Sequence, residues 1–127
     1  MTPIRMERLE SGVRIIIAFI EALNNHDLPA MLKLVSEDCI LEASFPAPEG
    51  VVLNGKPALT EYWQDFFTES PDAHLKIEEA FGFGQRCLAR WRGEWTDTTG
   101  KPTHLRGIDI FRVQNGLITE QLTYVKG

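Results

Sequence analysis

Apolar residues follow a helical period along the first part of the chain and alternate with polar residues later. Over the first 23 residues they recur every three to four positions, which predicts one long amphipathic helix. Its apolar positions are Met6, Leu9, Val13, Ile16, Ile17, Ile20 and Leu23. Thr2 and Pro3 suit the helix start as N-cap and first-turn residue, and Asn24-Asn25-His26 ends it.

Two shorter helices and one strand are expected next. Asp27 and Pro29 suit the start of a second helix, whose apolar positions are Met31, Leu32, Leu34 and Val35. A strand is predicted from Cys39 to Phe45, with Cys39, Leu41, Ala43 and Phe45 facing inward. The prolines and Gly50 that follow indicate an irregular loop, Pro46–Val52, and not further sheet. A third helix, from about Pro57 to Thr68, carries a wide aromatic face that includes Tyr62, Trp63 and Phe66.

Only strands are predicted from His74 onward. The four runs are about His74–Phe83, Arg86–Thr96, Thr103–Val113 and Leu117–Val125. Gly84-Gln85, Asp97–Lys101 and Asn115-Gly116 provide the turns between them, so we expect an antiparallel meander. Helices first and strands later are typical of an α+β domain, in which a curved sheet covers the helices with one face.

The alternation also indicates which face of the sheet is buried. In the second of these strands Ala89, Trp91, Gly93 and Trp95 share one side, and the tryptophans make it the inner face. In the next strand the same rule places Asp109 beside Leu105, Phe111 and Val113 on an apolar face. Burying a carboxylate costs several kcal/mol unless it is hydrogen-bonded, shifts its pKa or borders a cavity.

Asp109 is therefore the candidate functional residue of the chain, and two interpretations stay open. In one, its carboxyl group borders a cavity and acts on a bound molecule. In the other, it only forms a hydrogen bond with the indole of Trp91 or Trp95, or with the hydroxyl group of Thr123.

The opposite face of the same strand carries His104, Arg106, Ile108, Ile110 and Arg112. Two large aliphatic side chains on an outer face favour a contact surface. Because a sheet covered by helices on one side often pairs through the other, we expect a homodimer through the outer sheet face.

Composition narrows the class of protein. A chain of 127 residues with 43% hydrophobic residues is long enough for one ordinary core, so one domain, 1–127, is expected. A net charge of −5 without a basic cluster argues against nucleic acid as a partner. Cys39 and Cys87 lie in apolar runs, which favours buried free thiols. Charged residues flank or interrupt the one apolar stretch near the N-terminus, so we expect neither a signal peptide nor a membrane helix, and a cytoplasmic location.

Motifs for metals and cofactors are not found in the sequence. Three histidines are scattered and no HxxxH or CxxC spacing occurs, so a metal site is not expected. The Gly82-Phe83-Gly84 segment joins two strands and lacks the helix start that phosphate binding needs. We therefore expect no cofactor.

Several short segments, in this order and spacing, resemble one family over almost the whole chain. They are Ala22-Leu23-Asn24 before Asp27-Leu28, Ser36-Glu37-Asp38 before the first strand, Gly55 before the third helix, Gly107–Val113, and Asn115-Gly116. In these the chain resembles the SnoaL-like polyketide cyclases and ketosteroid isomerases, which share the nuclear-transport-factor-2-like (NTF2-like) fold. The resemblance implies a cone-shaped α+β barrel, in which N-terminal helices pack on a curved, mainly antiparallel sheet around a cavity.

The resemblance also implies roles for individual residues. Asp109 matches the aspartic acid that ketosteroid isomerases keep protonated in an apolar pocket as a hydrogen-bond donor. The tyrosine of those enzymes falls at Phe19 and their general-base aspartate at Ala43, so steroid isomerisation by that route is not expected. In limonene-type epoxide hydrolases an aspartate is expected where this chain has Thr123, so the resemblance to those enzymes fails in the same way. In the SnoaL-like cyclases the acid/base aspartate lies on the strand that holds Asp109.

These observations together define the expected site and function. We expect a pocket around Asp109 that binds a small apolar, oxygenated molecule, with the loop Pro46–Val52 bordering its mouth by resemblance to the family. Its expected lining residues are Phe19, Trp63, Trp91, Trp95, Phe111, Gln121 and Thr123. The expected function is that of a cofactor-independent isomerase or cyclase with Asp109 as acid/base. The alternative is a non-catalytic binding or dimerisation module, in which the aromatic residues are core and Asp109 is structural.

Overall fold

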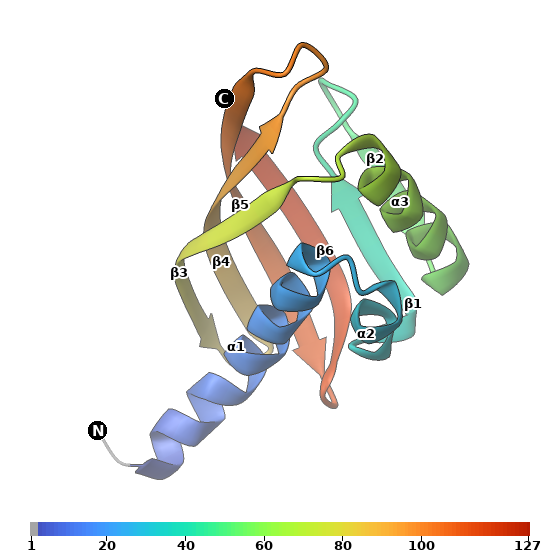
Figure 1. Ribbon diagram of the computed structural model, residues 1–127. Coiled ribbons are helices and arrows are strands. Elements are labelled where there is room, and N and C mark those ends of the chain that lie inside the picture. Colours follow the sequence, from blue (N-terminus) through green and yellow to red (C-terminus); the bar gives the residue numbers. More distant parts are fainter. Residues whose placement is uncertain (1–2) are drawn as a thin grey trace.

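Helices and strands follow one another in the described chain much as the hydrophobic pattern predicts. A computed structural model describes residues 3–127, with side chains described from residue 11 onward. Its helices are α1 (Pro3–Asn24), α2 (Leu28–Lys33) and α3 (Lys56–Glu69) (Figure 1). Its strands are β1 (Val35–Ala43), β2 (Val51–Asn54), β3 (His74–Phe83), β4 (Arg86–Thr96), β5 (Pro102–Gln114) and β6 (Leu117–Lys126).

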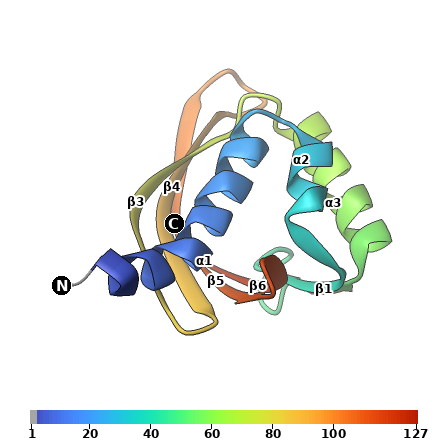
Figure 2. The same cartoon turned by 90° about the horizontal axis from the view of Figure 1, so that it is seen from below.

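The described strands form one mixed, mostly antiparallel sheet in the order β2-β1-β6-β5-β4-β3. The predicted meander of β3 to β6 is confirmed, because each of these strands pairs antiparallel with the next. Strand β1 joins β6 in parallel, and β2 adds an antiparallel edge to β1. The sheet curves around α1, with α3 on the other side of that helix, as Figure 2 shows. The α+β cone fold expected from the sequence is confirmed.

Three local predictions need correction. Val51–Asn54 forms β2, where an irregular loop was predicted as far as Val52; this edge strand has four residues and pairs only with β1. Helix α2 ends at Lys33, and Val35 already belongs to β1 because it pairs with Ile118 of β6. Phe45 was expected to face inward from a strand, but β1 ends at Ala43; the Phe45 side chain is 58% exposed, although it contributes to the lining of a cavity inside the cone.

Local hydrogen bonds explain two helix ends. The Asp27 carboxylate accepts a hydrogen bond from the Ala30 backbone N–H at 3.2 Å, which caps the start of α2. At the end of α1, the Asn24 side chain donates to the carbonyl oxygen of Leu75 and accepts from its N–H, both at 2.8 Å. These two bonds attach α1 to the edge strand β3. The proposed opening of α1 at Thr2 lies outside the described residues.

The core lies between α1 and the concave face of the sheet. Ile16, Phe19 and Ile20 of α1 are buried there, and the Phe19 and Phe111 rings meet edge to face with centroids 6.2 Å apart. Cys39 and Cys87 are buried free thiols, as predicted, and burial raises the pKa of Cys39 to about 12. None of the helices in the described part of the chain has the length and apolar character needed to span a bilayer.

Candidate functional site

Asp109 lies in the middle of β5 on the concave face of the sheet, where the alternation predicts it. Its side chain is 3% exposed. Directly opposite it stand Ala89 on β4 and Thr123 on β6, and diagonally opposite stand Trp91 and Gln121. Ala89 places only a methyl group directly opposite Asp109, while the large side chain on that strand, Trp91, lies diagonally across. Position and burial thus place one acidic group inside the cone.

One oxygen of this carboxyl group is held and the other has no hydrogen-bond partner. The Gln121 side-chain amide donates to Oδ2 of Asp109 at 3.0 Å. Oδ1 is buried and forms no hydrogen bond with the described residues. Burial raises the pKa of the Asp109 carboxyl, while the nearby polar groups of Thr123, Gln121 and Trp91 lower it in part. Of these three, the described contacts give only Gln121 hydrogen-bond geometry. Burial is the largest cause, so the net shift of the Asp109 pKa is upward.

A cavity of about 140 Å³ opens beside this carboxyl group. Helix α1 contributes Phe19, helix α3 contributes aromatic side chains, and the concave face of the sheet forms most of the rest, together with Ser44 and Phe45 after the end of β1. Five of the residues expected from the sequence line it together with Asp109: Phe19, Trp63, Trp91, Gln121 and Thr123. Phe111 is buried against Phe19 and does not border this cavity, and Trp95 lines a hollow next to it.

Other lining residues were not nominated for the site from the sequence. Tyr62 of α3 is half-buried in the cavity wall, and burial together with the nearby Asp109 charge raises the pKa of its phenol. The helical spacing of Tyr62 and Phe66 on the predicted aromatic face is the only signal in the sequence for this role. Ser44 also lines the cavity, and its hydroxyl group donates to the Thr123 carbonyl oxygen at 2.6 Å, which joins the end of β1 to β6.

Two indole groups in the cavity wall have unused hydrogen-bond donors. The Nε1 atoms of Trp63 on α3 and Trp91 on β4 are buried and have no partner among the described residues. The unpartnered Oδ1 of Asp109 is a third buried polar atom in the same wall. No lysine, arginine or histidine belongs to the described lining, and no group of His, Cys, Asp and Glu suited to a metal ion occurs among the described residues. The described lining of the cavity is therefore largely apolar, and it includes two indole N–H groups that can donate hydrogen bonds.

The floor of the cavity depends on two glycines. Gly93 of β4 and Gly107 of β5 lie under the six-membered ring of Trp91. A Cβ atom at position 107 would stand 2.7 Å from Cη2 of that ring, and one at position 93 would stand 3.2 Å from Cζ3. Any side chain at position 107 would therefore displace the indole of Trp91. The two glycines allow Trp91 to lie low across the sheet, below the space that a ligand would occupy.

Comparisons with known proteins agree with this architecture. The chain matches the SnoaL-like domain over residues 16–121. An NTF2-like protein of unknown function from Mesorhizobium loti is 34% identical, with 93% of each chain covered and a TM-score of 0.78. IdmH, a putative polyketide cyclase from Streptomyces antibioticus, is 20% identical, with 91% of each chain covered and a TM-score of 0.78.

A putative ketosteroid isomerase from Kribbella flavida is 15% identical, with 94% of this chain and 80% of that chain covered and a TM-score of 0.80. At these lower identities, the likeness to the cyclase and to the isomerase shows the fold alone. No curated protein matches the sequence.

Proposed function

The chain belongs to the SnoaL-like domain family, and we propose that its cavity binds a neutral, largely apolar molecule with a carbonyl oxygen, to which Asp109 donates a proton. The observation that carries this proposal is the buried carboxyl group with one unpartnered oxygen beside a cavity. The putative polyketide cyclase and the putative ketosteroid isomerase among the structural relatives are compatible with such a ligand.

The hydrogen bond from Gln121 supports a specific location for the proton of Asp109. The Gln121 amide donates to Oδ2, so Oδ2 acts as an acceptor. In the neutral acid the proton then belongs on Oδ1, the oxygen without a partner. Asp109 would thus present an O–H donor to a ligand, as neutral buried acids can do at neutral pH.

The other polar groups of the wall support the choice of ligand. The indole N–H groups of Trp63 and Trp91 can only donate, so they match a ligand with acceptor oxygens. An anionic ligand would lack a cationic partner in the described lining, and burying its charge would be costly. A neutral ketone or related carbonyl compound satisfies these donors and fits the aromatic walls.

Proton donation at this point supports isomerase or cyclase chemistry. As a proton leaves the carbon next to the carbonyl for water, the C–H electron pair forms a C=C bond. The carbonyl π electrons move to oxygen, which takes the proton of Asp109. The resulting enol is nucleophilic at its α-carbon. When that carbon takes a proton from the hydronium ion, the C=O bond forms again and the enol O–H returns its proton to the Asp109 carboxylate. In a β,γ-unsaturated ketone the intermediate is a dienol, and protonation at its γ-carbon moves the C=C bond. A donor placed at the developing oxyanion lowers the barrier to this step.

A second candidate function is binding without catalysis. Asp109 is the only carboxyl group in the described lining of the cavity, so no second carboxylate stands ready to remove a proton. In that case the three donors would hold a carbonyl compound without changing it.

The test uses cyclohexanone as a ligand in D2O. Binding is followed by quenching of tryptophan fluorescence, and deuterium uptake at the α-carbon is followed by NMR. Methylenecyclohexane is the matched control, because it keeps the ring shape without the acceptor oxygen. We expect the ketone to bind more tightly than the hydrocarbon and to exchange faster than in buffer. Binding without exchange would support the second candidate, and equal binding of both compounds would contradict the role of the donors.

A further inference from the structure

Asn115 and Gly116 form the turn between β5 and β6. Both residues are exposed, and both have a positive φ, 52° for Asn115 and 78° for Gly116. Gln114 and Leu117 are paired on either side of them, so the connection is a two-residue turn of type I′. The turn therefore presents an asparagine followed by a glycine to solvent.

The polar groups of this turn are not held by other parts of the chain. Neither the Asn115 side-chain amide nor the Gly116 backbone N–H forms a hydrogen bond with a described residue. A Cβ atom at position 116 would meet nothing within 4 Å, so the space beside Gly116 is open. Because glycine has no side chain, its nitrogen can approach the Asn115 side chain closely. The turn thus combines an unbonded amide nitrogen with an unbonded carboxamide on the preceding residue.

A second Asn-Gly pair provides a comparison within the same chain. Asn54 is the last residue of β2 and pairs with Ile40, and Gly55 is the N-cap residue of α3. The Gly55 N–H donates to the Cys39 carbonyl oxygen at 2.8 Å. Asn54 is exposed like Asn115, so exposure does not distinguish the two pairs. The difference lies in the hydrogen bond that holds the Gly55 nitrogen.

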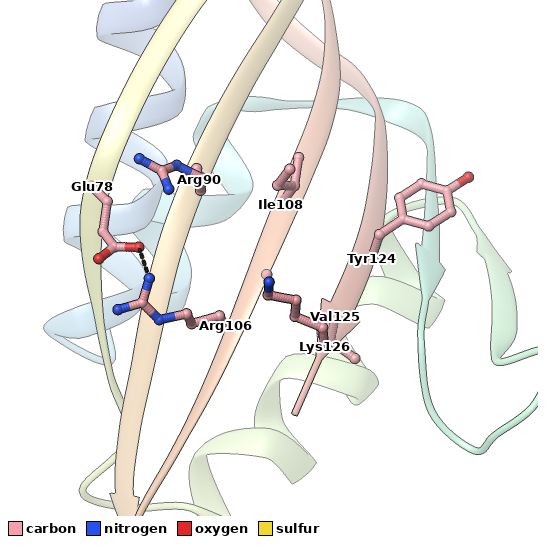
Figure 3. A pocket seen from close by; sticks show the side chains of 8 residues that line it. Glu78, Arg90, Arg106, Ile108, Tyr124, Val125 and Lys126 are labelled. Carbon is pink, nitrogen blue, oxygen red and sulfur yellow. Dashed lines mark hydrogen bonds and ion pairs between the residues drawn. The ribbon is translucent and has the colours of Figure 1, made fainter.

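The strand pairing next to the turn is short and irregular. Strand β5 pairs with β6 at consecutive positions from Arg106 until the register shifts before Val113. Beyond the shift, the described pairs with β6 are those of Val113 and Gln114. Figure 3 shows the other end of these strands, where Arg106 forms an ion pair with Glu78 of β3 at 3.3 Å. The end of the hairpin that carries the turn can therefore open while the rest stays paired.

We propose that Asn115 is a deamidation site, at which the chain reacts with itself and with water to form isoaspartate, and that it reacts faster than Asn54. The Gly116 nitrogen bonds to the side-chain carbonyl carbon of Asn115, and the C–N bond of the carboxamide breaks. Ammonia leaves with the proton of the Gly116 N–H, and a succinimide ring remains. Water then opens the ring: attack at the backbone carbonyl gives isoaspartate, and attack at the former side-chain carbonyl gives aspartate.

The product changes the backbone of the turn. Isoaspartate continues the chain through its side-chain carbon, which adds one backbone atom to a turn whose strand ends accommodate two ordinary residues. It also adds a negative charge to a chain with a net charge of −5. Asp109 lies about 20 Å along the strand from Asn115. We expect the modification to lower the free energy of unfolding through the end of the hairpin and to leave the cavity beside Asp109 unchanged.

Peptide mapping of the aged protein tests the site. The full chain is incubated, folded, at mildly alkaline pH in water enriched in heavy oxygen, and samples are digested with trypsin. Asn115 and Asn54 then fall in separate peptides, Val113–Lys126 and Leu34–Lys76. Electron-transfer fragmentation distinguishes isoaspartate from aspartate. We expect Asn115 to react at least about fivefold faster than Asn54, because the hydrogen bond of the Gly55 N–H must break before its nitrogen can attack. Isoaspartate should exceed aspartate, with one heavy oxygen atom incorporated.

The same chain unfolded in urea is the matched control. Without the fold both glycine nitrogens are free, so the rates at Asn115 and Asn54 should approach one another. The proposal is overturned if Asn54 reacts as fast as Asn115 in the folded chain, or if the ratio of the two rates is the same with and without urea, since the local sequence would then explain it. Aspartate without isoaspartate at Asn115 would also overturn it, because direct hydrolysis does not require attack by Gly116.

Thermal unfolding before and after ageing tests the effect on the hairpin. Asn115→Gly removes the carboxamide and leaves a Gly-Gly pair, which a type I′ turn accepts. Ageing should lower the Tm of wild type by several degrees and leave the Tm of this variant unchanged. Asn25→Gly, the same change at another exposed asparagine, should age as wild type does. If wild type and Asn115→Gly lose stability equally on ageing, the modification does not weaken the hairpin and that part of the proposal is wrong.

Discussion

Replacing Asp109 by asparagine should slow α-deuteration of cyclohexanone by about 100-fold or more, the range expected for loss of a general acid. Asparagine has nearly the same shape, so Gln121 can still donate to its side-chain oxygen, which takes the place of Oδ2. The new amide can donate a hydrogen bond to a ketone but cannot transfer a proton to it. Binding of the ketone should therefore stay within about threefold of wild type, while exchange is lost.

The control for this variant is Asp65→Asn, the same change on the exposed surface of α3. It should leave both exchange and binding as in wild type. Exchange that survives in Asp109→Asn would contradict the role of Asp109 as proton donor. In that case Asp109 would serve the structure of the concave face, and the exchange would have to arise from another group of the wall such as Tyr62.

The second large effect is a dependence of stability on pH. Burial raises the pKa of Asp109 in the folded protein above its ordinary value, so the folded state keeps a proton that the unfolded chain releases above about pH 4. The folded state then binds more protons than the unfolded state, and the free energy of unfolding falls as pH rises. This contribution is fully present below about pH 4 and is lost as pH rises through the folded pKa.

Urea unfolding of wild type and Asp109→Asn at a series of pH values measures this contribution. The stability of wild type minus that of the variant should decrease by up to about 1.4 kcal/mol per pH unit between about pH 4 and the folded pKa. Asp72 and Asp97, whose pKa values are lowered by hydrogen bonds, affect both proteins alike and cancel in the difference. A difference that is constant with pH, or that increases with it, would mean that Asp109 is ionised in the folded protein.

Periodicity was sufficient to predict most of the fold and the location of Asp109. The change from a helical period to alternation separates the helices from the meander, and each turn contains glycine, asparagine or aspartate. Side chains alternate between the two faces along a strand. Trp91 marks the inner face of its own strand, and the antiparallel meander then places Asp109 of the next strand on the same face. A short edge strand such as β2 escapes this reasoning because four residues contain too little alternation to distinguish it from a loop.

The depth of a residue inside the cone was not predictable in the same way. Trp91 and Trp95 share a face of β4, yet only Trp91 borders the cavity beside Asp109, because positions four residues apart along a strand are separated by about 13 Å. Phe111 shares a face with Asp109 but is covered by Phe19. Tyr62 reaches the same cavity from α3. Such neighbours depend on how the helices cross the sheet, and the sequence pattern does not specify that crossing.

The glycines beneath Trp91 have a consequence for how this cavity can diverge. Neither Gly93 nor Gly107 has a side chain, so the indole of Trp91 can lie directly against the backbone at both positions. A single methyl group at position 107 would displace the ring of Trp91, and so alter the cavity without replacing any residue that lines it. The size of the cavity beside Asp109 can thus change through a substitution at Gly107, which is not itself one of its lining residues.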